Sequence, residues 1–253
     1  MPILLVTGAT SGFGKAIAET FASKGFDVII TGRRKALLDA LQQNLTSQYG
    51  VRILALCFDV RNKKDSFDNI QNLPQEWQAV DILVNNAGGA WGRDRTDTAN
   101  IEDWENMLDT NVKGLMYISK AVIPGMKARG GGHIINMGSI AGKEVYELGN
   151  GYNAAKFAVD ALSKAMRIDL LPYRIKVTHI APGAAETEFS LVRFKGDEQK
   201  AAAIYQGYTP LSAQDVADAV YYTASLPAHV CINDLVITPT AQANSYYIFK
   251  DNH

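Results

Sequence analysis

Two side chains suited to proton transfer, Tyr152 and Lys156, lie four positions apart in the segment GYNAAKFAV. This segment is predicted to be helical, so both side chains project from one face about one turn apart. A free tyrosine has a pKa near ~10 and is a poor acid or base at neutral pH. An adjacent cation lowers the pKa of an acid by ~1–3 units, which makes the pair a candidate for proton transfer. The alternative is that Tyr152 serves only in packing.

A second chemical signal is the glycine-rich segment TGATSGFG (Thr7–Gly14), which joins a strand-like run to a helical one. Glycines in this position allow a tight turn, a close approach of the backbone to a pyrophosphate, and packing of the helix on the sheet. The N-terminus of the helix then offers free N–H groups to the phosphates. The spacing is GxxxGxG, and an ordinary turn is the alternative, but the position after the first strand favours cofactor binding.

The second strand-like run ends at Arg33 and Arg34, where an NAD-binding site carries an acid for the ribose 2′-hydroxyl. Asp27 lies at the wrong end of that strand, and Asp39 lies a full turn inside the next helix. Two guanidiniums suit a 2′-phosphate, which arginine can bind in a bidentate manner. The basic pair therefore predicts NADP as the cofactor, with a solvated basic turn as the alternative.

Polar residues also follow later strands. Asp59 comes after the third strand, where a carboxylate can meet an adenine amino group, although capping a helix near Asn62 is nearly as good an explanation. The motif NNAG (85–88) ends the fourth strand, and Ser139 follows the fifth. The carboxyl ends of parallel strands share one edge of the sheet, where ligands bind in such folds.

The elements that must position these residues are read from apolar runs that alternate with helical patterns. Strands are predicted at 3–7, 27–31, 52–58, 81–85, 133–138, 175–181 and 234–238. Helices are predicted at 13–24, 35–49, before Pro74, and at 101–109, 112–126, 151–171 and 213–225. Apolar strands that alternate with helices predict one doubly wound α/β domain over 1–253, with a mostly parallel sheet covered on both faces. The segment 189–210 is predicted to be irregular and to form a functional loop.

Composition excludes several classes of function. The net charge is −1 across 253 residues, so no basic footprint indicates a nucleic-acid partner. No apolar run approaches the ~18 residues of a membrane span, and no signal peptide is evident, so a cytoplasmic protein is expected. Cys57 and Cys231 form no pattern, and Cys57 is predicted to be buried in an apolar run. The histidines have no metal-ligand spacing, no metal is expected, and His179 is interpreted as a satisfied core residue.

Taken together, the motifs resemble the short-chain dehydrogenase/reductase family in order and spacing over almost the whole chain. The matching features are TGATSGFG, NNAG, Asn111, Ser139, the Tyr152 and Lys156 pair, and PGAAET (182–187). Two further segments, EFSLVRFKGD (188–197) and LPAHVCIN (226–233), resemble the branch of NADP-dependent serine/allo-threonine, or 3-hydroxy acid, dehydrogenases. The resemblance implies a Rossmann-fold enzyme that transfers hydride between NADP and a small 3-hydroxy acid of the serine, allo-threonine or 3-hydroxyisobutyrate type.

The resemblance also implies the role of each site residue. Tyr152 becomes the general acid or base, and Lys156 stays protonated, lowers the tyrosine pKa and binds the nicotinamide ribose. Ser139 binds the substrate oxygen, and Asn111 holds a water that relays protons from Lys156. Without the resemblance, Ser139 is more simply a turn residue and Asn111 a helix cap. The expected cofactor-binding residues are Gly8, Thr10, Ser11, Gly12, Phe13, Gly14, Arg33, Arg34, Asp59, Val60, Asn86, Ala87, Gly88, Tyr152, Lys156, Pro182, Gly183 and Thr187.

A lid over the substrate is expected at about 188–210, directly after the loop that reaches the nicotinamide. Phe189 and Arg193 are expected to contact the substrate together with Ser139 and Tyr152. Either Arg193 or Lys195 can meet a substrate carboxylate, although charged lid residues are often only solvated.

Two other functions remain open. One is reduction of a carbonyl or 3-ketoacyl compound by the same chemistry. The other is NADP sensing without turnover, which the retention of all four catalytic matches disfavours. Family members pair the helices at 112–126 and 151–171 across two-fold axes, so a homotetramer is expected.

Overall fold

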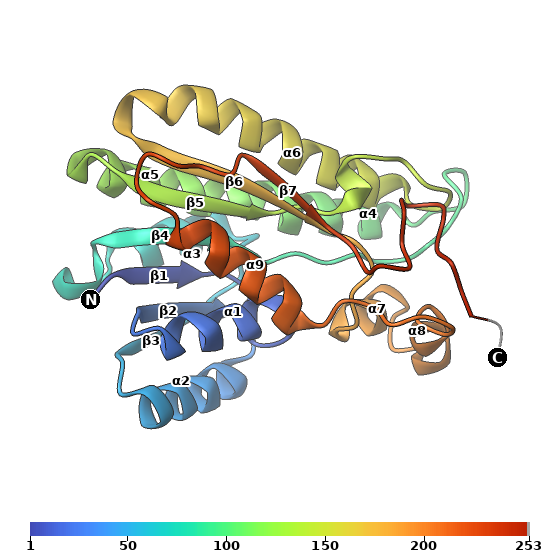
Figure 1. The fold of residues 1–253 in the computed structure, drawn as a ribbon, viewed down its shortest axis with the longest axis horizontal. Coiled ribbons are helices and arrows are strands. Elements are labelled where there is room, and N and C mark those ends of the chain that lie inside the picture. The colour runs from blue at the N-terminus through green and yellow to red at the C-terminus, as the bar shows by residue number, and fades with distance from the viewer. Residues whose placement is uncertain (252–253) are drawn as a thin grey trace.

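The computed structural model describes residues 1–251 and contains a seven-stranded, fully parallel sheet. The strands lie in the order β3-β2-β1-β4-β5-β6-β7 (Figure 1). Their bounds are β1 (Ile3–Val6), β2 (Asp27–Gly32), β3 (Ile53–Cys57), β4 (Val80–Asn85), β5 (Gly132–Met137), β6 (Ile175–Pro182) and β7 (Asp234–Ile237). The doubly wound parallel sheet predicted from the sequence is therefore confirmed.

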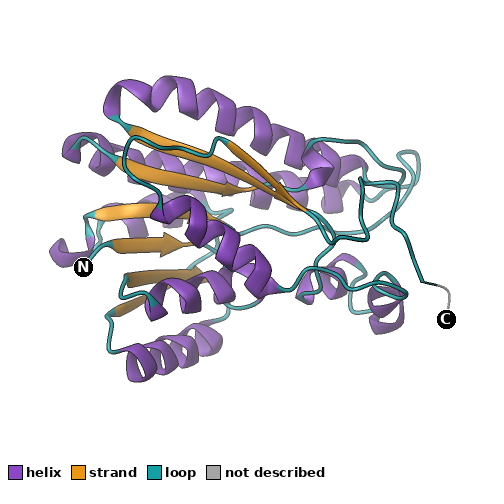
Figure 2. Cartoon of the chain, in the orientation of Figure 1, coloured by secondary structure: helices purple, strands orange, loops and turns teal. Residues whose placement is uncertain are grey.

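Helices cover both faces of this sheet, as Figure 2 shows. One face is covered by α1 (Gly12–Ser23), α2 (Lys35–Tyr49) and α9 (Ala213–Ser225). The other is covered by α3 (Lys63–Gln71), α5 (Leu115–Arg129) and α6 (Asn150–Leu170). Successive strand residues point to opposite faces. In β1, Leu4 and Val6 accordingly join the first core, and Ile3 and Leu5 join the second.

The segment predicted to be irregular, 189–210, contains two short helices, so that prediction was wrong. They are α7 (Glu188–Arg193) and α8 (Glu198–Ala203). The side chain of Thr187 accepts a hydrogen bond from the Phe189 N–H at the start of α7, and Asp197 caps α8 in the same way. These capping residues are a sequence signal for helices, but neither helix is long enough to show the apolar periodicity that the prediction required.

The helices predicted at 101–109 and 112–126 form one continuous helical path. It runs through α4 (Ile101–Leu108), a wider π turn η2 (Asp109–Gly114) and α5. Short 3-10 turns, η1 (Gln75–Trp77), η3 (Ile140–Gly142) and η4 (Leu171–Tyr173), complete the elements.

Cys57 is exposed, contrary to expectation. It ends β3, the edge strand of the sheet, and an edge strand lacks a neighbour on one side.

The neighbouring strands β1 and β4 mark the point where the strand order reverses, and ligands bind at the carboxyl ends of strands there.

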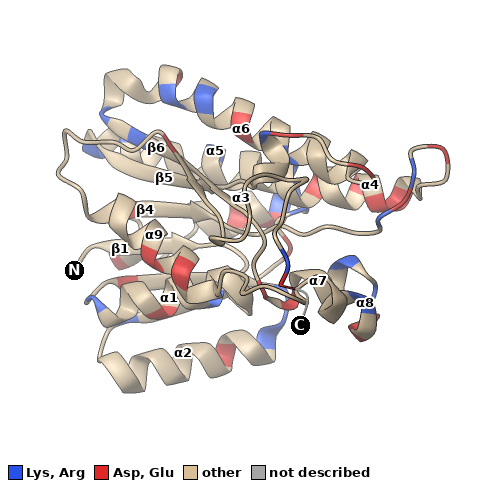
Figure 3. Ribbon diagram, turned by 45° about the vertical axis from the view of Figure 1, so that its right-hand side comes forward, with Lys and Arg blue, Asp and Glu red and all other residues tan. Residues whose placement is uncertain are grey.

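Basic and acidic residues are interspersed along α6 and α8 in the view of Figure 3. Of the helices within residues 1–251, none is sufficiently long and apolar to cross a membrane.

Candidate active site

A cleft of about 510 Å³ lies at the carboxyl ends of the strands. Its walls come from the glycine-rich loop, the ends of β2, β4, β5 and β6, the start of α6, and α7. All the expected cofactor-binding residues except Gly14 line this cleft. The expected substrate residues Ser139, Tyr152, Phe189 and Arg193 line it as well, whereas Asn111 does not. Segments far apart in the sequence thus meet in one cavity.

The glycine-rich loop has the backbone that its sequence demands. Gly8 and Gly12 adopt φ angles of 69° and 52°, a region that other residues rarely occupy. Gly14 has a different role, because a Cβ at this position would lie 2.3 Å from the Gly8 carbonyl oxygen. It allows α1 to pack against the loop. Because α1 begins at Gly12, and Gly12 and Phe13 line the cleft, N–H groups of a helix N-terminus are available there.

Arg34 lies beside this loop at the end of β2. Its Nε and Nη2 donate to Thr10 Oγ1 at 3.0 and 2.8 Å, and Nη2 also donates to Ser11 Oγ at 2.8 Å. Its Nη1 donates to Glu188 Oε2 at 3.1 Å, which joins it to the first residue of α7. The neighbouring Arg33 has its Nη1 3.8 Å from Asp59 Oδ2. Both guanidiniums therefore lie in the cleft where the sequence predicts a 2′-phosphate.

The carboxylate of Asp59 forms an ion pair with the neighbouring Arg61. Arg61 donates from Nη2 to Asp59 Oδ2 at 2.7 Å. Burial opposes ionisation of Asp59, but the hydrogen bonds and charge of Arg61, together with Arg33, lower its pKa below the usual value. Asn62, and not Asp59, caps α3 by accepting a hydrogen bond from the Asp65 N–H, so the capping alternative was wrong for Asp59. A contact with adenine stays a prediction.

Tyr152 and Lys156 lie one turn apart at the start of α6, as their spacing predicts. The Lys156 Nζ donates to the Met137 carbonyl at 2.9 Å and lies 5.7 Å from the centre of the Tyr152 ring. Ser139 lies two residues after the end of β5, and its Oγ donates to the Pro182 carbonyl at 3.4 Å and accepts from the Ala141 N–H at 3.1 Å. The end of β5 and the start of α6 therefore bring these three side chains to one wall of the cleft.

The protein's own groups shift the two pKa values in an unexpected direction. Burial raises the pKa of Tyr152, and the neighbouring Tyr146 adds to this, whereas the Ser139 hydroxyl and the Arg193 guanidinium act in the opposite direction. Burial also lowers the pKa of Lys156 to about 8. The expected lowering of the tyrosine pKa is thus wrong for the chain alone, because loss of solvent outweighs the opposing effects of Ser139 and Arg193. It requires a further positive charge, such as an oxidised nicotinamide.

Asn111 lies within the π turn, and it is not the helix cap that was the alternative. Its Nδ2 donates to the carbonyls of Gly89 and Met107 at 2.9 and 2.8 Å, and its Oδ1 accepts from the Gly89 N–H at 3.2 Å. A Cβ at Gly88 would lie 2.5 Å from this oxygen. Asn111 therefore holds the loop that follows NNAG, and its part in a proton relay stays a prediction.

Arg193 is buried in the wall of the cleft, with 9% of its surface exposed. Its Nη2 donates to the Tyr146 hydroxyl at 3.1 Å, and its guanidinium lies 5.7 Å from the centre of the Tyr152 ring. Within residues 1–251, its buried Nε–H has no hydrogen-bond partner and no carboxylate pairs with it. Phe189 packs on Tyr152 with their ring centres 5.4 Å apart. The site can therefore seat a small anion close to the tyrosine.

Lys195 does not share this position. Its Nζ pairs with Asp103 Oδ2 at 2.8 Å, on α4, and the side chain does not line the cleft. Glu188 lines the cleft and Phe194 does not. Of the two basic residues considered for a substrate carboxylate, only Arg193 is in place.

Trp91, Tyr146 and Gln242 are among the lining residues that sequence reasoning missed. Gln242 accepts a hydrogen bond from the Ala184 N–H at 2.8 Å and so connects the segment after β7 to the end of β6. None belongs to a motif. They come to the site through tertiary structure from loops whose spacing in the sequence carries no signal.

The chain is similar to known dehydrogenases over nearly its full length. The family model described as short chain dehydrogenase matches residues 2–197. The NADP-dependent 3-hydroxy acid dehydrogenase of Salmonella typhi is 47% identical over 242 residues, which cover 95% of this chain and 96% of that protein. Sulfoacetaldehyde reductase 2 of Chromohalobacter salexigens is 44% identical, with 97% of both chains covered.

Solved structures show the same likeness. The closed form of a serine dehydrogenase complexed with NADP⁺ superposes with a TM-score of 0.92 at 45% identity, covering 99% of this chain and 100% of that one. Serine dehydrogenase from Escherichia coli superposes with a TM-score of 0.81 at 42% identity, covering 95% and 99%.

Proposed function

The chain belongs to the short-chain dehydrogenase family, and on this premise we propose that it is an NADP-dependent dehydrogenase of small 3-hydroxy acids. Several relatives and solved structures of 42–48% identity are named as NADP-dependent 3-hydroxy acid dehydrogenases or as serine dehydrogenases. The cleft of this chain holds the residue types which that chemistry needs.

The residues present fit NADP. The glycine-rich loop and the start of α1 offer backbone N–H groups to the phosphates. Arg33 and Arg34 line the cleft at the end of β2, where a dianionic 2′-phosphate gains from bidentate hydrogen bonds. When bound, NADP accepts a hydride from the carbon of the substrate alcohol.

The catalytic side chains manage the proton of the same reaction. Ser139 holds the substrate oxygen, and the Tyr152 oxygen accepts the hydroxyl proton during oxidation and returns it during reduction. Lys156 stabilises the phenolate by its charge, and its pKa of about 8 leaves it mostly protonated at neutral pH. Asn111 holds the water that carries the proton onward from Lys156.

The observation that carries the choice of substrate is Arg193. A guanidinium that is buried, close to Tyr152 and without an acidic partner among the described residues favours a substrate with its own negative charge. A carboxylate can take a charge-assisted hydrogen bond from the free Nε–H. The distance from Arg193 to Tyr152 suits a short substrate, in which the acid lies close to the alcohol.

The second candidate function is reduction of a small sulfonated aldehyde, because a sulfonate offers Arg193 the same charge. It rests on the relative named sulfoacetaldehyde reductase 2. The wider alternative, a carbonyl or 3-ketoacyl reductase, gains no support from a buried arginine that selects for a small anion.

The proposal extends to the lid, the assembly and the compartment. The segment 188–210 covers the substrate, because α7 carries both Phe189 and Arg193 into the cleft wall. The assembly is a homotetramer in the cytoplasm. Large apolar side chains on α5 and α6 are exposed, notably Met116 at 44% and Ile168 at 75%, and pairing of these helices between copies covers them.

The test is a substrate screen with the wild-type protein. Oxidation of 3-hydroxyisobutyrate, serine, 2-hydroxyethanesulfonate and the uncharged methyl ester of 3-hydroxyisobutyrate is followed with NADP and with NAD. The hydroxy acids with NADP should give the highest kcat/KM. A higher value for the sulfonate supports the second candidate, and a higher value for the ester overturns the hydroxy acid assignment in favour of a general carbonyl reductase.

A further inference from the structure

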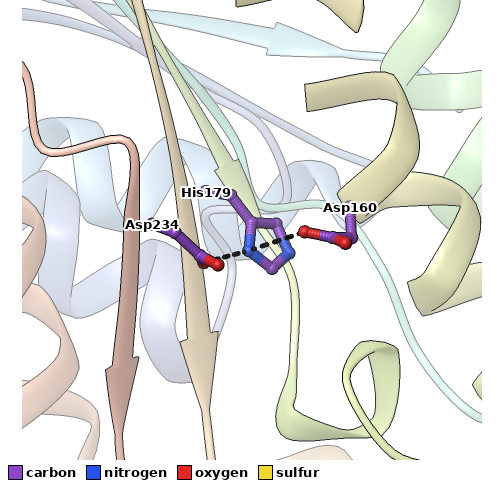
Figure 4. Close-up of side chains that lie close together, drawn as sticks. All are labelled: Asp160, His179 and Asp234. Atoms are coloured by element: carbon purple, nitrogen blue, oxygen red, sulfur yellow. Dashed lines mark hydrogen bonds and ion pairs between the residues drawn. The ribbon is translucent and has the colours of Figure 1, made fainter. Parts of the chain in front are cut away.

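A cluster of charged groups lies behind the catalytic wall of the cleft, where three elements meet. Figure 4 shows Asp160 on α6, His179 on β6 and Asp234 on β7. The His179 Nδ1 lies 2.8 Å from Asp234 Oδ1 and 3.7 Å from Asp160 Oδ1. Lys143 completes the cluster, since its Nζ donates to Asp160 Oδ1 at 2.8 Å and also to Asp234 Oδ2. None of these four side chains lines the cleft.

Lys143 supplies the positive charge that joins the two carboxylates of this cluster. The ligand atoms of Asp160, His179 and Asp234 lie within 4.8 Å of one another, a spacing that also suits a metal ion. The ammonium of Lys143, however, bonds to both carboxylates and takes the position of such a cation. Burial opposes ionisation of Asp160 and Asp234, but hydrogen bonds outweigh it and lower the pKa of each carboxyl: those from Lys143 and Lys164 at Asp160, and those from Lys143 and His179 at Asp234.

His179 is neutral in this arrangement. Burial is the main cause of its lowered pKa, and the nearby charge of Lys143 lowers it further, against the opposing effect of Asp234. The neutral ring therefore carries its proton on Nδ1 and donates it to Asp234. The other nitrogen, Nε2, is buried without a partner in residues 1–251, so the expectation that His179 is a satisfied core residue is right for only one of its two nitrogens.

The cluster connects directly to the segment that carries Ser139. At one end of this segment, a Cβ at Gly138 would lie 1.9 Å from His179 Nε2. At the other end, a Cβ at Gly142 would lie 2.5 Å from the Lys156 carbonyl oxygen, and Lys143 follows at once. Ser139 thus lies between the imidazole of His179 and the helix that carries Tyr152 and Lys156.

We propose that Lys143 is a positioning residue, which joins the segment Gly138–Lys143 to α6 and β7 and thereby sets Ser139 against Tyr152. The inference rests on the proposed oxidoreductase function, because its effect is on the geometry of proton transfer. Asp160 lies one helical turn after Lys156, so the bond from Lys143 anchors the segment to the same helix that carries the catalytic pair. Lys143 touches neither the cofactor site nor the substrate site.

The first test compares Lys143→Met with Lys164→Met. Lys164 pairs with the other oxygen of Asp160 at 2.6 Å from the exposed side of α6, so it is a matched control. Small displacements of a catalytic group lower rates by about 10-fold to 100-fold. Lys143→Met should therefore reduce kcat by about that factor with an unchanged Kd for NADP, and Lys164→Met should stay close to the wild type. Lys143→Arg, which keeps the charge and two donors, should recover much of the loss.

The pH profile separates positioning from a general loss of structure. The charged groups that act on His179 are Asp234, Asp160 and Lys143. Lys164 pairs with Asp160, and Arg167 donates to the carbonyls of Val177 on β6 and of Asn233. Without Lys143, two carboxylates face the imidazole and its pKa rises. As the pH falls, protonation of His179 supplies the missing cation. In the direction of carbonyl reduction, the ratio of kcat for Lys143→Met to kcat for wild type should therefore rise toward low pH.

Three results would overturn the proposal: an unchanged kcat in Lys143→Met, a loss of NADP affinity equal to the loss of kcat, or a ratio that does not vary with pH. If the methionine variant does not fold, Lys143→Gln is used, with the same expectations. A crystal structure of the variant with NADP provides a measurement that needs no turnover, and an unmoved Ser139 there also contradicts the proposal. Absence of turnover in the wild type would instead contradict the proposed function.

Discussion

Arg34 and Arg193 both line the same cleft, and they differ in how the protein holds them. The side chain of Arg34 is 46% exposed, bonds to two hydroxyls and pairs with Glu188, which is itself 52% exposed. Arg193 is buried, bonds to one phenol and has no acidic partner among residues 1–251. The charge of Arg34 is already balanced by an exposed acid, whereas the charge of Arg193 has no balancing anion among the described residues.

This difference in burial indicates which arginine contributes more to selectivity for its anionic ligand. An exposed ion pair contributes only ~0–1 kcal/mol. A phosphate that binds Arg34 beside Glu188, or in its place, therefore gains binding free energy mainly from its own hydrogen bonds to Arg34. A buried guanidinium without a counter-ion is costly, and an anionic substrate relieves this cost on binding. We therefore expect selectivity for a charged substrate to exceed selectivity for NADP over NAD.

The largest effect should come from Tyr152→Phe. This change removes the proton-transfer group, on which turnover depends whichever anion each arginine binds. The ring and its packing on Phe189 remain, but the proton acceptor is lost, and positioned proton transfer contributes ~10²–10⁴-fold to the rate. We expect kcat to fall by about that factor for the acid and for its methyl ester alike, with NADP affinity unchanged in a fluorescence titration.

The pH dependence of the wild type belongs to the same prediction. Oxidation requires the deprotonated tyrosine, so kcat/KM for oxidation should rise with pH, and the rate of reduction should fall. Because burial raises the pKa of Tyr152 in the chain alone, a midpoint below that of free tyrosine requires a positive charge beyond those of the chain, such as that of the oxidised cofactor. Near-normal turnover in the phenylalanine variant would remove Tyr152 from the mechanism.

The next effect in size should be that of Arg193→Met. Hydrogen bonds to charged groups contribute ~1.5–3 kcal/mol, which corresponds to about 10-fold to 150-fold in kcat/KM. We expect this loss for 3-hydroxyisobutyrate and only a small change for its uncharged methyl ester. Lys195→Met is the matched control, because Lys195 lies in the same segment but pairs with Asp103 on α4. Equal losses for acid and ester would show that Arg193 only supports the lid.

The surroundings of Arg34 and of Arg193 differ in how well they could be predicted from the sequence. The strands and the glycine-rich turn were predicted from apolar runs and motif spacing, and the pairing of β1 with β2 then brings Arg34 beside Thr10 and Ser11. The substrate end depends on Tyr146 and Gln242, which reach it through tertiary packing and belong to no motif.

Local signals also fail where burial decides the outcome. The spacing of Tyr152 and Lys156 was predicted correctly, but the direction of the tyrosine pKa was not, because spacing says nothing about loss of solvent. The same reason explains why the sequence left Arg193 and Lys195 as equal candidates. Only the fold shows that one is buried in the cleft and the other is paired on α4.

A smaller, cofactor-specific effect should follow from Arg33→Ala combined with Arg34→Ala. The pair should weaken NADP binding by about 10-fold to 100-fold through the loss of charge-assisted hydrogen bonds, and NAD binding should change little. Lys35→Met is the matched control, because Lys35 lies next in sequence and its ammonium bonds to Asp39. Calorimetric titration with both cofactors measures the difference, and equal losses for NADP and NAD would contradict a 2′-phosphate site.

The smallest effect should come from Glu188→Gln, and its sign tests the comparison most directly. Glu188 Oε2 accepts from Arg34 Nη1 at 3.1 Å, so its carboxylate balances the same charge that a 2′-phosphate needs. Removing this negative charge should tighten NADP binding, but by less than about 5-fold, because exposed pairs contribute only ~0–1 kcal/mol. The gain should be greater at low salt, since screening weakens an exposed interaction.

Glu198→Gln on α8 is the control for Glu188→Gln, since it removes the same charge from an exposed helix start nearby. NAD affinity should not change in either variant, because NAD carries no 2′-phosphate. Weaker NADP binding in Glu188→Gln would mean that the carboxylate orients Arg34 for the phosphate and does not compete with it. In that case Arg34, like Arg193, would be held in place by its neighbours to bind an anion, and the two arginines would differ only in their exposure to solvent.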